Sequence, residues 1–171
     1  MTFLSRLTYR VRQFKLAFVG PWPPIPDVSL SPHLTPSLIT LFRRMSPSEQ
    51  AHSFAVLQRL QGQGHTDADL LTAALLHDVG KVRSPLSVLD RVIIVLARRI
   101  IPRVAGKWGA GEPRGWRKPF VTASCHPAWG ADLAAEAGAS PRACALIRRH
   151  QDAADSNDPL LLALHSADDF E

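Results

Sequence analysis

The sequence has few cysteines and lacks any long hydrophobic run. Only two of its 171 residues are cysteines, Cys125 and Cys144, and no Cys-x-x-Cys pair occurs, so nothing indicates a disulfide framework or an oxidising compartment. The longest apolar runs, such as residues 92–97, reach about a third of the roughly 20 residues that a bilayer-spanning helix needs. Basic residues interrupt any signal-peptide core near the N-terminus. These absences exclude a membrane-spanning helix and favour a cytoplasmic protein.

Acidic residues are outnumbered by basic ones, 15 to 20, which gives a net charge of +5 and a pI near 9.9. Such a balance attracts anions, among them nucleotides, nucleic acids and lipid headgroups, without choosing among them. The N-terminal stretch combines basic and apolar residues at helical spacing. It predicts either an interfacial helix in peripheral contact with acidic lipid or a helix packed on its own domain. The basic residues are Arg6, Arg10, Arg12 and Lys15, and the apolar ones are Phe3, Leu7, Val11, Phe14 and Phe18.

The chain is long enough to bury one hydrophobic core, but it is short for two full domains. With 171 residues and 46% hydrophobic content, it predicts a single domain that carries an N-terminal extension. We place the extension at residues 1–45, with the basic helix, a proline-rich connector over 20–32 and a short helix. The main domain then covers residues 46–171.

Prolines mark most of the expected helix starts. A proline at the first helical position lacks an N–H that could not be satisfied there, and a preceding oxygen-bearing side chain caps the helix. Ser46-Pro47-Ser48-Glu49 also fits a capping box. The pattern predicts an all-α protein, with no competing strand pattern. The pairs are Thr35-Pro36, Ser46-Pro47, Ser84-Pro85, Ser140-Pro141 and Asp158-Pro159; the helices are 36–45, 47–61, 67–79, 85–104, 127–137, 141–150 and 159–170, with Gly80 and Gly138 as terminators.

Four polar residues are expected on apolar helix faces. His52 shares a face with Ala55 and Val56, the adjacent His77 and Asp78 end an almost wholly apolar helix, and Asp168 follows apolar residues on the last helix. Burying an isolated charge costs several kcal/mol, so we expect these groups to be paired or to bind a metal. Each residue alone is more typical of a core histidine or a capping aspartate. Their joint occurrence on three helices indicates a metal site.

One segment resembles the defining motif of the HD-domain metal phosphohydrolases. It is Ala73-Ala74-Leu75-Leu76-His77-Asp78-Val79-Gly80-Lys81; His52-Ser53-Phe54-Ala55-Val56 resembles the family's first ligand segment, and Ala167-Asp168 resembles its last. The resemblance covers about residues 46–169. It implies an HD-domain helical bundle in which His52, His77, Asp78 and Asp168 bind a divalent ion such as Mn, Fe, Co, Ni, Zn or Mg. The ion would activate water for attack at phosphorus, and Asp78 would orient that water.

A second group resembles the HD-GYP branch of the same family. His126-Pro127-Ala128-Trp129-Gly130 is similar to that branch's His-Pro-x-x-Gly segment, and His150 to its following histidine. The resemblance implies a second metal, and therefore one or two ions per chain. One expected histidine and the Gly-Tyr-Pro signature are missing, which weighs against hydrolysis of a cyclic dinucleotide. The alternative roles are structural: His126 would cap a helix that begins at Pro127, and His150 would stabilise the negative end of its own helix.

Further basic residues are candidates for substrate binding. The family resemblance implies that Lys81 contacts a substrate phosphate; the alternative is a solvated cation at a helix end. Of Arg148 and Arg149, one would face the cleft and the other solvent. Residues 82–120 hold nine basic and two acidic residues, together with Trp108 and Trp116. This segment would bind a base and phosphates, or form a solvated helix with core tryptophans. We assign no role to His33 or His65, and His165 would support Asp168 or be a core or surface residue.

The leading hypothesis is a hydrolase that cleaves a phosphomonoester or phosphodiester, favouring a nucleotide, with Asp78 and Lys81 as catalytic residues. The competing hypothesis is a non-catalytic module that binds metal and a nucleotide or a partner protein. Retention of the buried His-Asp pair favours the enzyme. No motif for reading nucleic acid is recognised, and the oligomeric state is left open.

Overall fold

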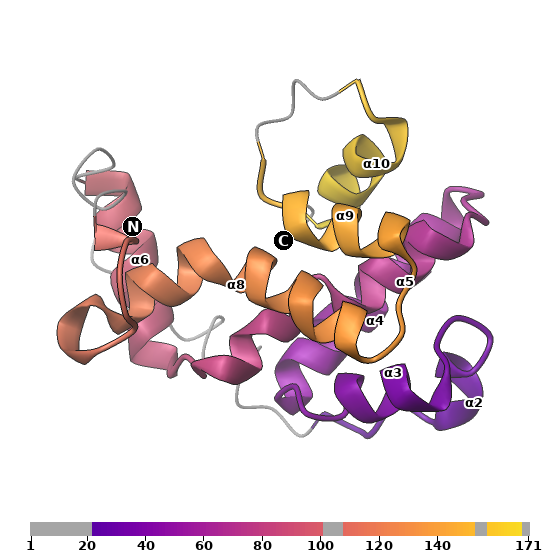
Figure 1. Cartoon of the computed structure of the whole chain (residues 1–171), viewed down its shortest axis with the longest axis horizontal. Coiled ribbons are helices and arrows are strands. Elements are labelled where there is room, and N and C mark those ends of the chain that lie inside the picture. Colours follow the sequence, from indigo (N-terminus) through magenta and orange to yellow (C-terminus); the bar gives the residue numbers. More distant parts are fainter. Residues whose placement is uncertain (1–21, 101–107, 153–156, 169–171) are drawn as a thin grey trace, which may run out of the picture.

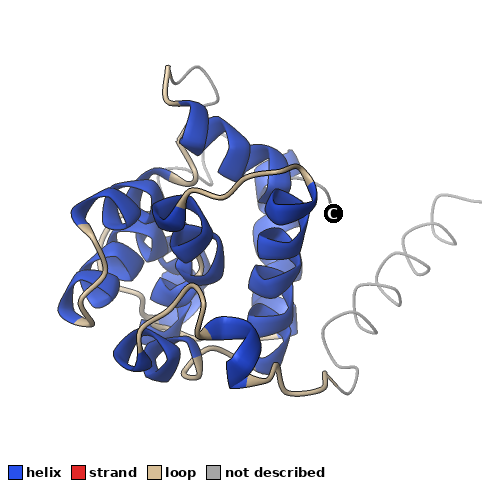
Figure 2. Ribbon diagram, turned by 90° about the vertical axis from the view of Figure 1, so that its right-hand side faces the viewer, coloured by secondary structure: helices blue, strands red, loops and turns tan. Residues whose placement is uncertain are grey.

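The structure is a computed structural model, and it describes residues 22–100, 108–152 and 157–168. Every regular element in this part of the chain is a helix, and no strand occurs in it (Figure 2). The prediction of an all-α protein is therefore confirmed. The helices in chain order are α2 (Asp27–Leu30), α3 (Pro36–Phe42), α4 (Pro47–Gly62), α5 (Ala68–Leu76), the 3-10 helix η1 (Val79–Arg83), α6 (Val88–Ile100), the 3-10 helix η2 (Gly115–Arg117), α8 (Lys118–Glu136), α9 (Pro141–Arg149) and α10 (Pro159–Asp168).

Four of the five proline-marked starts are confirmed. Thr35, Ser46 and Ser140 cap α3, α4 and α9 by accepting a hydrogen bond from a backbone N–H three residues later. Asp158 Oδ1 accepts from the backbone N–H groups of Leu160 and Leu161, two and three residues later, at the start of α10. Ser46 and Glu49 form the predicted capping box. Local capping chemistry therefore sets these boundaries.

Two helix starts were wrong. After Ser84-Pro85 the chain stays irregular, and α6 begins only at Val88, because Ser87 and Asp90 form a reciprocal pair of hydrogen bonds that caps it. Pro127 does not begin a helix but lies inside α8, which starts nine residues earlier at Lys118. The proposed role of His126 as a cap is therefore wrong as well. His126 has no side-chain oxygen to accept from the first turn, and its Nδ1 donates to the Thr122 carbonyl within α8.

One hydrophobic core joins the helices. α8 packs against α9 and η1, α5 against α4 and α9, and α10 against α4, α5 and α9. Nearly all of α5 is buried, as its apolar sequence predicted. Buried apolar residues between Ile25 and Met45, on and around α2 and α3, belong to the same core cluster. The described part of the predicted N-terminal extension thus packs on the main domain, with α2 and α3 at one end of the molecule and α6 at the other (Figure 1).

Gly80 has a different role from the predicted helix terminator. It lies within η1 and its φ is not positive, whereas Gly138 has φ 90° just after α8, as a terminator should. A Cβ at Gly80 would lie 1.9 Å from the His126 carbonyl oxygen and 2.6 Å from the Gly130 nitrogen. Gly80 therefore lets η1 approach the backbone of α8. This close approach brings Asp78, just before η1, next to His126 of α8.

The remaining predictions concern membranes and the chain ends. Within the described ranges no helix combines the length and the apolar character that crossing a bilayer requires. The predicted amphipathic helix near the N-terminus lies outside the described residues, as do residues 101–104 of the predicted helix 85–104 and residues 169–170 of the last helix.

Candidate metal centre

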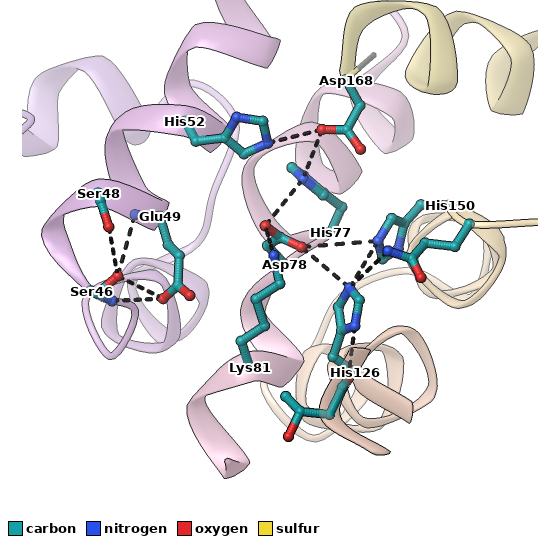
Figure 3. Close-up of polar contacts among 12 residues, drawn as sticks. Ser46, Ser48, Glu49, His52, His77, Asp78, Lys81, His126, His150 and Asp168 are labelled. Atoms are coloured by element: carbon teal, nitrogen blue, oxygen red, sulfur yellow. Dashed lines mark hydrogen bonds and ion pairs between the residues drawn. The ribbon is translucent and has the colours of Figure 1, made fainter. Parts of the chain in front are cut away.

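The first group of polar side chains joins α4, the end of α5 and the end of α10. His52 Nε2 lies 2.9 Å from Asp168 Oδ1, and His77 Nε2 lies 3.5 Å from the same oxygen (Figure 3). The three residues each offer a ligand atom, and these atoms all lie within 4.8 Å of one another. We call His52, His77 and Asp168 the first cluster.

His77 is held rigidly in this cluster. It follows directly on α5, its side chain is 1% exposed, and its Nδ1–H donates to the Ala74 carbonyl at 2.9 Å. That bond leaves a lone pair on Nε2, which is buried and makes no hydrogen bond. A buried polar atom without a partner is costly and points to a missing ligand. A backbone bond to the other ring nitrogen is typical of metal-binding histidines.

The second group consists of Asp78, His126 and His150, and we call it the second cluster. His126 Nε2 lies 3.3 Å from Asp78 Oδ1 and 3.2 Å from His150 Nε2 (Figure 3). His150 Nε2 is 4.0 Å from Asp78 Oδ1. All three side chains are buried, and their ligand atoms again lie within 4.8 Å of one another.

In the second cluster, the Nε2 atoms of His126 and His150 point toward each other. His126 Nδ1 donates to the Thr122 carbonyl at 3.0 Å, and His150 Nδ1 donates to the Ile147 carbonyl at 2.8 Å. In the neutral tautomers that these bonds select, both Nε2 atoms are acceptors. Two acceptors 3.2 Å apart repel each other unless a cation lies between them.

Asp78 connects the two clusters. Its Oδ1 faces His126 and His150, whereas its Oδ2 contacts the Lys81 ammonium and lies 3.7 Å from His77 Nε2. The two oxygens of one carboxylate are therefore directed to different groups. Because His77 and Asp78 are neighbours in the turn between α5 and η1, this short segment supplies a donor to each cluster.

The electrostatics favour the ligand-ready forms of Asp78, Asp168 and His150, but not of His77: burial lowers the pKa of His77, and the negative charges of Asp78 and Asp168 outweigh burial and raise it. Burial opposes the charge of Asp78, but Lys81 and His77 hold the pKa of Asp78 well below its usual range. Burial likewise opposes the charge of Asp168, but the hydrogen bond with His52 and the nearby His77 ring keep its pKa far below normal. Burial, reinforced by His77 and then His126, lowers the pKa of His150 to about 3. Asp78 and Asp168 are thus charged and His150 is neutral near pH 7, as metal binding requires.

The donor set fits divalent metal ions. Four imidazole nitrogens and two carboxylates suit manganese, iron, cobalt, nickel or zinc. Neighbouring ligands at about 2.1 Å from an ion are about 3.0–3.4 Å apart, close to the 3.2 and 3.3 Å spacings within the second cluster. Six residues that sequence alone nominated are therefore brought together in two adjoining groups.

The other nominated residues have different surroundings. Lys81 pairs with Asp78 and is only 17% exposed, so it lies at the centre and not in solvent. Arg148 binds Asp132 at 2.6 Å, and Arg149 contacts Asp152 at 3.1 Å. Each of these arginines contacts a carboxylate outside the two clusters, and the expectation that one of them faces the cleft stays a prediction.

His165 and Gln151 are two further polar residues beside α9. His165 Nε2 contacts the Arg149 carbonyl at 3.4 Å, so its contact is not with Asp168. Gln151 was not singled out from the sequence, yet its Nε2 lies 3.5 Å from His126 Nε2. Its position directly after His150 is the only sequence signal that could have indicated it.

The tryptophans of the basic segment pack on each other. Trp108 contacts Trp116 and Phe120 in edge-on geometry, with ring centroids 5.1 and 5.0 Å apart. Trp108 is half-buried, while Trp116 is 64% exposed. The half-buried Trp108 matches the expectation of a tryptophan packed on the core, whereas Trp116 leaves an aromatic face in solvent.

Comparison with known proteins agrees with this geometry. The HD domain family model matches residues 50–171, a range that contains both clusters. No curated protein and no solved structure matches the chain significantly. The match covers well over half of the sequence. The chain therefore belongs to the HD-domain family, a superfamily of metal-dependent phosphohydrolases.

Proposed function

We propose that the two clusters hold two divalent ions and that the protein hydrolyses a phosphomonoester or a phosphodiester. The observation that carries this proposal is the pair of buried imidazole lone pairs, His126 Nε2 and His150 Nε2, 3.2 Å apart beside the Asp78 carboxylate. A purely structural histidine pair would use one ring N–H to donate to the other. Here the backbone takes both Nδ1 hydrogens.

The residues divide into two ligand sets with Asp78 between them. His52, His77 and Asp168 would hold one ion, His126 and His150 the other, and Asp78 would offer one oxygen to each. When bound, such a pair of ions lowers the pKa of a water molecule and neutralises charge on the phosphoryl oxygens. The Asp78 carboxylate can also accept a hydrogen bond from the attacking water and so orient it toward phosphorus.

Lys81 is placed to bind an anionic substrate. Its ammonium lies beside Asp78 at the edge of the centre, and it retains 17% exposure. It would donate to a phosphate oxygen of the substrate and release part of its contact with Asp78. Because Arg148 and Arg149 are engaged elsewhere, Lys81 is the better candidate for substrate binding among the three.

The substrate class follows from charge and from the partial likeness to the HD-GYP branch. The net charge of +5 favours a phosphorylated small molecule, and a nucleotide is the class that the sequence favours. His126, Gly130 and His150 resemble the branch, but the Gly-Tyr-Pro signature is missing after Asp152. A cyclic dinucleotide is therefore not proposed.

Hydrolysis assays test the proposal directly. A phosphomonoester, a phosphodiester and a nucleotide panel would be incubated with the full chain under several divalent ions. Asp78→Asn keeps the shape of the side chain but removes its charge, and Asp132→Asn is the matched control, because Asp132 lies on α8 and binds only Arg148 among its described contacts. Metal-dependent activity that Asp78→Asn abolishes and Asp132→Asn keeps would support the hydrolase. Absence of activity in the folded, metal-loaded wild type would instead favour a binding module.

A further inference from the structure

Helix α6 exposes most of its apolar side chains. Leu89, Ile93, Leu96 and Ile100 are 67%, 39%, 42% and 72% exposed. Their spacing of four, three and four residues places them on one face of the helix. We call these four residues the apolar stripe. Among the side chains of this helix that the structure describes, only Ile94 is buried. Helix α6 packs mainly on α8, at the end of the molecule opposite α2 (Figure 1).

The apolar stripe is unusual for a surface in water. Single exposed aliphatic residues are normal, but a contiguous row of them marks an interaction surface. None of the candidate metal ligands comes from α6, since they lie on α4, at the end of α5, on α8, at the end of α9 and on α10. The role proposed for the two clusters therefore does not account for it.

The segment around α6 is strongly basic. Residues 82–120 contain nine basic residues and only two acidic ones, Asp90 and Glu112. The same segment carries Trp116, which is 64% exposed in η2. Tryptophan is enriched where proteins meet the boundary between lipid and water. An aliphatic face, an excess of basic residues and an exposed tryptophan together match the composition of an interfacial helix.

Other occupants fit the stripe less well. A second copy would bring two basic segments together, and four residues on a 13-residue helix bury far less than the roughly 800 Å² per partner of a stable interface. The N-terminal stretch, residues 1–21, has four basic residues and no acidic one, so it would be repelled by the segment. A nucleic acid would match the charge but leave the stripe in water.

We propose that α6 docks on an anionic lipid bilayer. The apolar stripe would enter the boundary between headgroups and acyl chains, while the excess positive charge of residues 82–120 would attract the lipid phosphates. This surface is independent of hydrolysis, so it can be tested whether or not the protein has activity.

Vesicle flotation of the full chain tests this proposal. One set of vesicles contains phosphatidylcholine with phosphatidylglycerol and the other phosphatidylcholine alone. The variant is Leu89→Ser with Ile100→Ser, and the control is Val28→Ser, which changes an equally exposed residue (78%) in α2. We expect wild type and Val28→Ser to float with the anionic vesicles only, and the double variant to lose binding by about tenfold or more.

Folding and alternative partners are checked alongside. Both substituted residues are exposed, so the melting temperature of the double variant should equal that of wild type; Ile100→Glu serves as a second variant that places a negative charge against the lipid phosphates. The proposal is overturned if wild type does not float, or if both variants float as well as wild type. It is also overturned if light scattering shows that wild type is a dimer and the double variant a monomer. A third contrary result would be that the variants still bind the vesicles and that an oligonucleotide competes this binding away.

Discussion

Replacing Gly80 by alanine tests the contact that brings η1 and α8 together. An added Cβ would lie 1.9 Å from the His126 oxygen, 2.6 Å from the Gly130 nitrogen and 2.8 Å from the His126 carbonyl carbon. All three atoms belong to the backbone of α8, so no side-chain rotation relieves the overlap. The two helices must separate for the methyl group to fit.

The expected cost follows from overpacking. Extra methyl groups in a packed core usually cost about 1–3 kcal/mol, and a clash with backbone belongs at or above the upper end. At about 2–4 °C per kcal/mol for a chain of this size, Gly80→Ala should lower the melting temperature by about 6–12 °C. Thermal unfolding followed by circular dichroism measures this.

Two other glycines provide graded controls. Gly130→Ala places its Cβ 3.1 Å from the Gly80 nitrogen and 3.3 Å from a methyl group of Ile147, so a smaller loss is expected. Gly62→Ala at the end of α4 meets nothing within 4 Å and should be neutral or stabilise by at most about 1 kcal/mol. If Gly80→Ala proved as stable as Gly62→Ala, the close approach of η1 and α8 would be refuted.

Two further stability predictions concern caps and ion pairs. Ser46→Ala removes the cap of α4 and leaves the buried Glu49 carboxylate without its hydroxyl partner, so chemical denaturation should show a loss of about 1–2 kcal/mol; an unchanged midpoint would argue against the capping box. Arg142→Ala removes two hydrogen bonds that hold the pKa of Asp158 below its usual value. Because the folded-state pKa is lowered, this stabilisation, at most about 1 kcal/mol, is present above the unfolded-state pKa of about 3.9 and is lost as pH falls through the folded-state value. Urea titrations at pH 7 and pH 3 should show the two proteins converging at the lower pH, and a constant difference would contradict the assignment.

The helical fold could be predicted wherever local chemistry decides. Thr35, Ser46, Ser140 and Asp158 each provide an oxygen one residue before a proline, and each begins a helix. Where two capping signals compete, the reciprocal pair of Ser87 and Asp90 determines the start of α6, beyond Ser84-Pro85.

Pro127 shows the limit of the same reasoning. A proline removes one hydrogen bond from a helix interior, and the local signal therefore suggested a break. In the structure Pro127 is buried within α8, so tertiary packing holds the helix together through it. Packing against other helices cannot be read from local signals.

Part of the candidate site could likewise be predicted from the sequence, and part of it depends on tertiary packing. The chemistry of the donors was readable, since His52, His77, Asp78 and Asp168 stand out as polar groups on apolar faces. The role of Asp78 as a link between two clusters was not, because it depends on the approach of η1 to α8 at Gly80 and Gly130. The carboxylate that engages Arg148 was equally hidden, since Asp132 lies on α8 and Arg148 on α9.

Metal stoichiometry is the most direct test of the proposed centre. The full chain would be stripped with a chelator, reloaded with manganese or zinc, desalted and analysed by elemental mass spectrometry. We expect two ions per chain in wild type and in His33→Gln, whose histidine lies outside both clusters, and one ion in His150→Gln. A folded wild type that retains no ion, or a His150→Gln variant that retains as many as wild type, would contradict the account.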